Sequence, residues 1–239
     1  MKSPKSSQSL PWVLVNVAMT ADGKIALANG RYAPFGSRRD HDHLLELRAT
    51  ADAVMCGART ADSFPVNLGP GPAKYRRLRQ KRGLAEYNLR IIVSGSGSID
   101  PRAEIFRHRF SPIVILTTSS ISPARLKRLR GLADEVIVFG RKNMNFPAAL
   151  RWLKAKYGVK RLVCEGGGEL NAALFQQGLV NELHLTICPV IFGGRTAPTL
   201  AGGIGIKNLT DAEQLKIISM KRVGEEMFLI FHRREDISA

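Results

Sequence analysis

The amino-acid sequence predicts an α/β fold: a mostly parallel central sheet flanked by helices, with antiparallel strands at its C-terminal edge. Two observations predict this class. Through most of the chain, short apolar runs that suit buried strands alternate with segments of helical periodicity. Near the end, two strand-like runs follow one another with only Gly224-Glu225 between them.

The first elements have clear start and stop signals. Residues 1–9 are too polar to pack, so we expect a disordered tail followed by a single domain over residues 10–239. Trp12 to Met19 alternates as a buried strand does, and a turn follows it. Ser37 and Asp40 resemble a capping box at the start of a helix that reaches about Ala49.

The middle of the chain contains its longest stretch without a regular pattern. Between the strand at 53–56 and the strand at 89–94, the segment 65–88 has Pro, Gly and basic residues but little apolar periodicity. We interpret it as a long loop, and such loops in compact domains are often functional. After a strand at 113–117, Ser122-Pro123 opens a helix that closes at Gly131.

The second half continues the alternation and then turns to strands. The expected strands are 136–139, 161–164, 183–190, 214–222 and 227–233, and the expected helices are 148–157 and 170–177.

Composition limits the possible partners and the compartment. The formal charge of +16 favours anionic partners, but no nucleic-acid motif accompanies the basic clusters, so we expect a phosphorylated small molecule and no nucleic acid. No apolar run reaches membrane-spanning length. Cys56, Cys164 and Cys188 stand singly in apolar runs, which suits buried thiols in the cytoplasm and no metal site.

The strongest local signal is a strand, three glycines and a helix around 164–177. Successive glycines let the backbone approach a ligand, and helix N-terminal N–H groups favour phosphate oxygens, so this segment predicts a pyrophosphate seat. It matches neither a Rossmann fingerprint nor a P-loop. Glu165 ends the strand, where open α/β sheets place ligand groups. Asp22 and Lys24 form a second charged pair, just after the first strand.

Four stretches resemble the reductase family of riboflavin biosynthesis: VNVAMTADGKIA, LRATADAVMCGART, EGGGELNAALFQQGLVNELHLTICPVIFGGRTAPT and GEEMFLIF. They occur in the family's order over most of residues 12–231. The resemblance implies a dihydrofolate-reductase-like fold and NADPH-dependent reduction of a ribosylaminopyrimidine 5′-phosphate to its ribityl form. It leaves open whether the substrate is the diaminopyrimidinone or the deaminated uracil form.

The resemblance also implies roles for individual residues. For the cofactor, the implied residues are Ala18, Gly57, Thr60, Ser94, Gly95, Ser96, Gly166, Gly167, Gly168, Glu169 and Leu170. For the substrate, they are Asn16, Asp22, Arg48 and Glu165. Lys24 and Glu165 are expected to assist proton transfer as catalytic residues, and Arg48 to hold phosphate or hydroxyl oxygens. The family is typically a homodimer, and the strand-rich C-terminal part suggests where the two copies meet.

One segment departs from the family. After Thr60 the family has two Asp before a Pro and then a substrate-facing arginine, whereas this chain has Asp62-Ser63-Phe64-Pro65 and no such arginine. Lys74, Arg76 and Arg77 are candidates to replace it. A reductase of a pterin or another heterocycle therefore remains an alternative, and a basic nucleic-acid-binding protein is a distant one.

Overall fold

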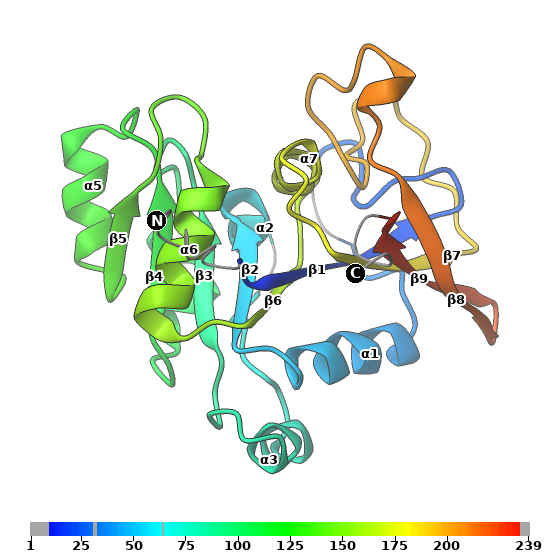
Figure 1. Cartoon of the computed structure of the whole chain (residues 1–239), viewed down its shortest axis with the longest axis horizontal. Helices are drawn as coiled ribbons and strands as arrows, with labels where there is room; N and C mark the ends of the chain where they lie inside the picture. The colour runs from blue at the N-terminus through cyan, green and yellow to red at the C-terminus, as the bar shows by residue number, and fades with distance from the viewer. Residues whose placement is uncertain (1–9, 31–32, 64, 235–239) are drawn as a thin grey trace, which may run out of the picture.

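The computed structural model describes residues 10–30, 33–63 and 65–234, and within them the strands form a nine-stranded sheet in the order β5-β4-β3-β2-β6-β1-β7-β9-β8 (Figure 1). The strands are β1 (Trp12–Thr20), β2 (Ala53–Gly57), β3 (Leu89–Val93), β4 (Ile113–Thr117), β5 (Glu135–Val138), β6 (Arg161–Cys164), β7 (Glu182–Cys188), β8 (Leu215–Val223) and β9 (Glu226–Arg233). The tail predicted at residues 1–9 lies outside the described residues.

The helices lie on both faces of this sheet (Figure 1). They are α1 (Arg38–Arg48), α2 (Ala58–Ser63), α3 (Ala73–Lys81), α4 (Glu104–Arg107), α5 (Pro123–Arg130), α6 (Phe146–Tyr157) and α7 (Gly168–Gln176), with a 3₁₀ turn at Leu209–Asp211. None of the described helices is both long enough and apolar enough to cross a membrane.

The strand directions confirm the predicted fold class. Strands β1 to β7 pair in parallel, while β9 pairs antiparallel with both β7 and β8. β6 lies between β1 and β2 in the sheet. From β1 the chain extends the sheet in one direction through β2 to β5, and it later adds β7 on the other side of β1. Ligands of open α/β sheets bind beside the carboxyl ends of the strands where the strand order reverses in this way.

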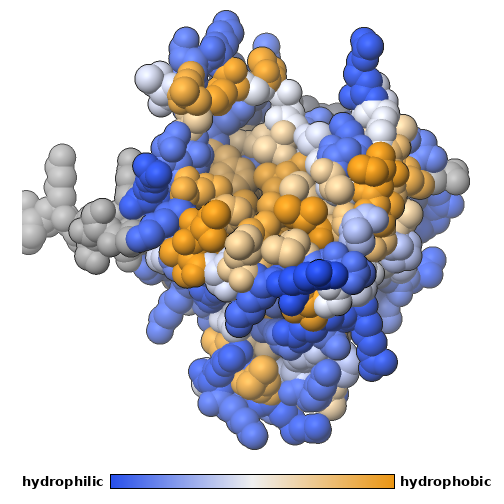
Figure 2. Space-filling view, turned by 90° about the vertical axis from the view of Figure 1, so that its right-hand side faces the viewer, coloured by the Kyte–Doolittle hydropathy of each residue, from blue (hydrophilic) through white to orange (hydrophobic). Residues whose placement is uncertain are grey.

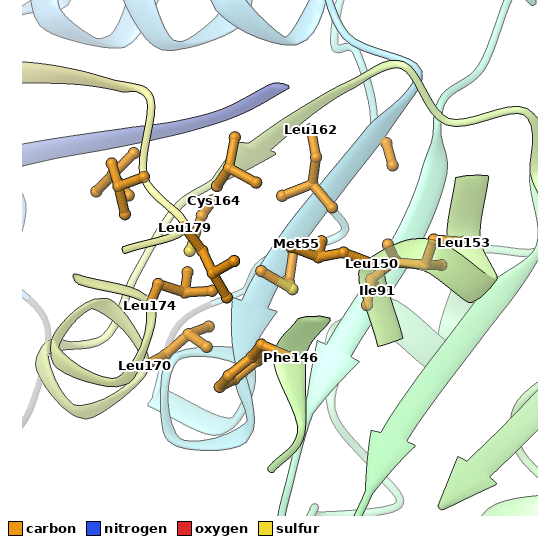
Figure 3. Close-up of a cluster of buried hydrophobic side chains, with 14 of the residues drawn as sticks. Met55, Ile91, Phe146, Leu150, Leu153, Leu162, Cys164, Leu170, Leu174 and Leu179 are labelled. Atoms are coloured by element: carbon orange, nitrogen blue, oxygen red, sulfur yellow. The ribbon is translucent and has the colours of Figure 1, made fainter. Parts of the chain in front are cut away.

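Each face of the sheet has its own core. On one face, α6 and α7 cover the centre of the sheet, and Figure 3 shows Phe146 and Leu150 of α6 and Leu170 and Leu174 of α7 pointing onto Met55 and its neighbours. On the other face, α2, α4 and α5 pack on strands β2 to β5, and α1 packs on β1 and β6. This two-sided covering explains why the parallel strands read as continuous apolar runs.

The predicted helix bounds agree with the structure to within two residues, but one start signal works differently from the prediction. Ser37 caps α1, because its Oγ accepts hydrogen bonds from the N–H groups of Arg39 and Asp40 at 3.1 and 3.3 Å. The capping box was wrong: the Ser37 N–H donates to Glu226 Oε1 at 2.6 Å instead of bonding to Asp40. A partner 189 residues away therefore replaces the local one.

The prediction of a continuous loop over 65–88 was also wrong, since α3 lies inside it. Its buried residues include Tyr75, which packs on Leu45 and Ala49 of α1, while Leu78 is only partly buried there. Another buried position is Arg79, a charged residue, so the apolar periodicity that reveals a helix is almost absent. The four-residue helix α4 was likewise not predicted.

The core on the α7 face predicts a stability change. Leu174 is fully buried there, so Leu174→Ala should lower the free energy of unfolding by about 2–5 kcal/mol through lost burial and a residual cavity. Leu209, 83 % exposed, is the control, and its alanine variant should stay within about 0.5 kcal/mol of the parent. Urea denaturation followed by circular dichroism measures both, and equal effects would contradict this packing.

Candidate functional site

Most residues assigned to the site from sequence lie along one edge of the sheet. The adjacent strands β3, β2, β6 and β1 end there, and the segments 94–96, 57–60, 165–170 and 18–24 follow at or near their carboxyl ends. Because these strands are parallel and hydrogen-bonded in register, segments far apart in sequence become neighbours. The topology thus places the predicted cofactor and substrate segments side by side.

The glycine triplet forms a backbone cradle between β2 and α7. The Gly57 N–H donates to the Gly166 carbonyl oxygen at 2.8 Å, and the Gly167 N–H donates to Thr60 Oγ1 at 3.2 Å. A Cβ on Gly168 would overlap the Thr199 carbonyl oxygen, so only glycine fits there. Glu169 and Leu170 complete the first turn of α7, whose N–H groups lack partners within the helix. These residues fit the pyrophosphate of a dinucleotide.

A second anion-binding candidate follows β3. Gly95 lies beside the end of β4, since its carbonyl oxygen accepts hydrogen bonds from the hydroxyls of Thr117 and Thr118 at 3.1 and 2.9 Å. Arg125 reaches the neighbouring backbone and donates to the Ser96 carbonyl oxygen at 3.2 Å. Ser94 begins this loop and is 5 % exposed. Hydroxyls and a guanidinium at the ends of adjacent strands suit a phosphate group.

Glu165 forms a buried ion pair with Arg48 at the end of β6. Arg48 donates from Nε to Glu165 Oε1 at 2.5 Å and from Nη2 to Oε2 at 2.7 Å, and both side chains are 10 % exposed. Arg48 Nη1 donates to the Gly69 carbonyl oxygen at 2.6 Å. Two residues that were assigned separately to the substrate are therefore brought together, and in this structure Arg48 holds the carboxylate.

Asn16 and Ala18 lie on β1 next to this ion pair. Val15 pairs with Cys164, so the following residues, Asn16 and Glu165, are neighbours across the two strands. Asn16 is 8 % exposed, and its Oδ1 has no hydrogen-bond partner among the described residues. A buried acceptor without a partner, next to a carboxylate, is suited to a ligand with hydrogen-bond donors.

Lys24 and Asp22 occupy the turn after β1 in different ways. Asp22 accepts from the Thr20 hydroxyl at 2.6 Å and from the N–H groups of Phe192 and Gly193 at 3.1 and 2.7 Å. These bonds, led by that of Thr20, lower the pKa of Asp22 to about 2. Its carboxylate thus joins two loops. The Lys24 backbone bridges to Thr199, the residue that lies against Gly168, which places Lys24 near the cradle.

Lys74, Arg76 and Arg77, the candidates to replace the family's substrate-facing arginine, all lie on α3. Lys74 pairs with Asp42 at 3.6 Å, and Arg76 pairs with Glu86 at 3.0 Å, so both charges are used elsewhere. Arg79 of α3, which the sequence did not single out, contacts Arg48: its Nη1 donates to the Arg48 carbonyl oxygen at 2.7 Å. Arg79 is surrounded in sequence by other charged residues, so no sequence pattern indicated that it is buried.

Sequence reasoning also missed a buried network beneath α1. His43 Nε2 and His184 Nδ1 are 2.9 Å apart, and His184 Nε2 lies 2.6 Å from Glu182 Oε1. Trp12 and Arg161 donate to Glu182 Oε2 at 2.8 and 2.9 Å. Burial opposes ionisation of Glu182, but the His184 hydrogen bond and the Arg161 charge prevail and lower its pKa to about 2. Burial also lowers the pKa of His43.

This network predicts a pH-dependent stability term. The pKa of Glu182 falls from 4.5 to about 2 on folding, so its ionised form stabilises the fold above pH 4.5, and this stabilisation is lost as the pH falls toward 2. Glu182→Gln should cost about 2–3 kcal/mol at pH 7 and progressively less below pH 4.5. Urea unfolding from pH 3 to 7 measures it. Glu225→Gln, at an exposed carboxylate, is the control, and a pH-independent cost for Glu182→Gln would contradict the assignment.

No group of three or more His, Cys, Asp or Glu in the described ranges is arranged to hold a metal ion.

Comparison with known proteins gives a consistent match. The model of the RibD C-terminal domain family matches residues 11–229. The 2,5-diamino-6-ribosylamino-4(3H)-pyrimidinone 5′-phosphate reductase of Methanothermobacter thermautotrophicus is 33% identical over 219 residues, covering 92% of this chain and 96% of the relative. The protein of the same name from Archaeoglobus fulgidus is also 33% identical, with coverages of 90% and 94%.

Solved structures agree with the sequence matches. A pyrimidine reductase-like protein from Corynebacterium diphtheriae superposes with a TM-score of 0.77 at 26% identity, covering 93% of this chain and 92% of its own. The riboflavin biosynthesis reductase Rib7 of Saccharomyces cerevisiae superposes with a TM-score of 0.66 at 13% identity, covering 97% of this chain and 93% of its own. At this identity the match shows only a shared fold. The predicted dihydrofolate-reductase-like architecture is confirmed.

Proposed function

Since the chain belongs to the RibD C-terminal domain family, we propose that it reduces 2,5-diamino-6-ribosylamino-4(3H)-pyrimidinone 5′-phosphate to the ribityl compound in riboflavin biosynthesis. The observation that carries this proposal is the Glu165–Arg48 pair beside the glycine cradle, at the same sheet edge. A substrate site and a dinucleotide site in contact are what a hydride transfer requires. The single nine-stranded sheet of the described residues supports our proposal that residues 10–239 form one reductase domain.

The cofactor of this reductase is a nicotinamide dinucleotide, and we propose NADPH over NADH. The loop Ser94 to Ser96 offers hydroxyls and backbone N–H groups beside Arg125, and it contains no carboxylate. An acidic residue at such a position would favour the free ribose hydroxyl of NADH, whereas a cation and hydroxyls favour the 2′-phosphate. Gly167 and Gly168 would hold the pyrophosphate.

The proposed reaction needs an opened sugar. The ribose ring opens as the C1′–O4′ bond breaks: the glycosidic nitrogen gives up its proton and becomes doubly bonded to C1′, while O4′ takes a proton, which leaves a neutral imine. Bound NADPH supplies the hydride that adds to C1′. The imine nitrogen then takes a proton, which leaves a ribityl amine. Positioned acids and bases accelerate such transfers by about 10²–10⁴-fold.

Residues after β6, on β1 and in the turn after β1 would supply the polar contacts for this chemistry. Glu165 would accept hydrogen bonds from the substrate's hydroxyl or amine groups, with Arg48 holding its charge. Asn16 Oδ1 would accept one further donor from the substrate. Lys24 would provide the proton to the opened sugar, and Asp22 would act indirectly by holding its turn.

A spectrophotometric assay tests the activity. NADPH loss at 340 nm would be followed with the diaminopyrimidinone, its deaminated uracil analogue, a pterin and dihydrofolate as substrates. We expect turnover with a ribosylamino substrate and a lower kcat/KM with NADH. Turnover of the pterin or dihydrofolate alone would favour the alternative reductase, and equal efficiency with both cofactors would contradict the 2′-phosphate assignment.

Glu165 gives the sharpest variant for this proposal. Glu165→Gln keeps the shape but removes the charge that holds Arg48 and the substrate, so kcat should fall about 100-fold or more. Affinity for NADPH, measured by fluorescence titration, should stay within a few-fold because the cradle is backbone. Circular dichroism reports the folded fraction. Near-normal turnover of folded protein would assign Glu165 a purely structural role.

We further propose a homodimer formed through β8. Ile217 and Met220 on this strand are 57 % and 63 % exposed, and within the described residues β8 pairs with β9 alone. Figure 2 shows hydrophobic surface gathered on this side of the molecule, surrounded by hydrophilic side chains. An apolar edge strand is self-complementary about a two-fold axis, so a second copy fits it.

Light scattering coupled to gel filtration tests the dimer. The parent chain should elute with about twice its 26.3 kDa mass, and Met220→Lys should shift it toward a single chain by placing a charge in the interface. Val138→Lys is the matched control, because Val138 is 41 % exposed on β5 at the opposite edge. A monomeric parent chain at micromolar concentration would exclude this assembly.

Cys56, Cys164 and Cys188 are buried and free, which supports a reducing compartment, and we propose that this reductase works in the cytoplasm.

A further inference from the structure

The guanidinium of Arg79 lies at the C-terminal end of α1. Its Nη1 donates to the carbonyl oxygens of Arg48 and Ala51 at 2.7 and 2.5 Å, and its Nε donates to that of Ala85 at 2.9 Å. The residue is 1 % exposed. The last carbonyls of a helix have no partner within it, and a rigid fork of donors can satisfy several at once. Arg79 therefore fixes the end of α1 from the neighbouring helix.

Arg79 has no carboxylate within ion-pair distance in the described parts of the chain. Its charge is balanced by the dipoles of the carbonyl groups that it binds. Because the guanidinium is buried, losing these hydrogen bonds would be costly. Arg82, which caps the C-terminal end of α3, adds to the contact: its Nη1 donates to the Ala49 carbonyl oxygen at 3.3 Å. Helix C-terminal dipoles favour cations at this position.

The residue fixed by Arg79 is the same one that holds Glu165. The Arg48 carbonyl oxygen accepts a hydrogen bond from Arg79. The Arg48 side chain donates to Glu165 and to the Gly69 carbonyl oxygen. The Gly69 end of this contact is held separately, because the Gly69 N–H donates to Asn67 Oδ1 at 2.8 Å. The preceding Leu68 is fully buried with φ at 55°, and Asn88 binds its carbonyl oxygen at 2.8 Å.

We propose that Arg79 is a positioning residue, which places Arg48, and through it Glu165, for the reduction. This inference rests on the proposed function. Arg79 acts through the Arg48 backbone and touches no reacting atom. Without it, the Arg48 and Ala51 carbonyl oxygens lose their buried side-chain donor, and the end of α1 can shift even though Asp52 still binds Arg161 of β6. A displacement of about 1 Å in a reacting group costs roughly 100-fold in rate.

A second buried arginine supplies a matched control. Arg90 on β3 is 0 % exposed and also binds backbone carbonyls, with Nη1 donating to those of Ile105 and His108 at 3.2 and 2.7 Å. It holds the segment 105–111, whose residues, all described by the structure, make no hydrogen bond to Arg48 and reach it only indirectly, where Phe110 packs against Gly69. Arg90 also donates to Ser111 and lies 4.1 Å from the centroid of the Phe110 ring. Each methionine variant therefore removes one buried arginine that binds backbone carbonyls, Arg79→Met at the Arg48 backbone and Arg90→Met at the segment 105–111.

The experiment measures kinetics and hydrogen exchange in both variants. We expect Arg79→Met to lower kcat about 10–100-fold per folded molecule with the KM for NADPH within about two-fold, and Arg90→Met to keep kcat within about three-fold. Amides of residues 45–51 should exchange at least about ten-fold faster in Arg79→Met only. Arg79→Lys and Arg90→Lys, which keep the charge but lose the fork, repeat the comparison if the methionine variants do not fold.

Three outcomes separate the ideas. Unchanged kcat and unchanged exchange in the Arg79 variants would overturn the positioning role. Equal losses in the Arg79 and Arg90 variants would also overturn it, because they would reflect stability alone. If the parent chain reduces none of the substrates, the proposed function fails, and exchange at 45–51 still decides whether Arg79 holds the end of α1.

Discussion

The insertion of β6 between β1 and β2 is the constraint on which the candidate site depends. Cys164 pairs with Val15 on one side and with Met55 on the other, and the ladder continues as the Glu165 N–H donates to the Met55 carbonyl oxygen at 2.8 Å. The carboxylate and the glycines therefore start from a backbone held on both sides. Sites built on such rigid elements keep their geometry better than sites built on free loops.

The two faces of β7 have different surroundings, one apolar and one polar. On β7, the side chains of Leu183 and Leu185 enter the apolar core beneath α6 and α7, whereas those of Glu182 and His184 lie beneath α1 in a hydrogen-bonded network. Charges buried in this way must be paired, because breaking such a pair costs far more than the pair contributes. Near β7, the α1 face can carry these polar groups because the opposite face of the same strand packs into a large apolar core.

Patterns local in sequence were predicted well, and contacts between distant segments were not. The strands agree with prediction to within two residues, and the glycine triplet was correctly placed between strand and helix because both signals lie within a few residues. The Ser37–Glu226 bond, the burial of Arg79 and the His43–His184 contact join segments that no local pattern connects. Helix α3 escaped notice for a related reason, since its buried face includes an arginine whose partners are carbonyls of other segments.

The position of β9 affects the order in which the sheet can form during synthesis. β9 is the last strand along the described chain, yet it lies inside the sheet between β7 and β8. On a ribosome, β7 therefore shows an unpaired apolar edge, and β8 has nothing to join, until Glu226–Arg233 emerges. A chain stopped short in the turn at Gly224 would lose two strands from the sheet, although it would lack the residues of only one.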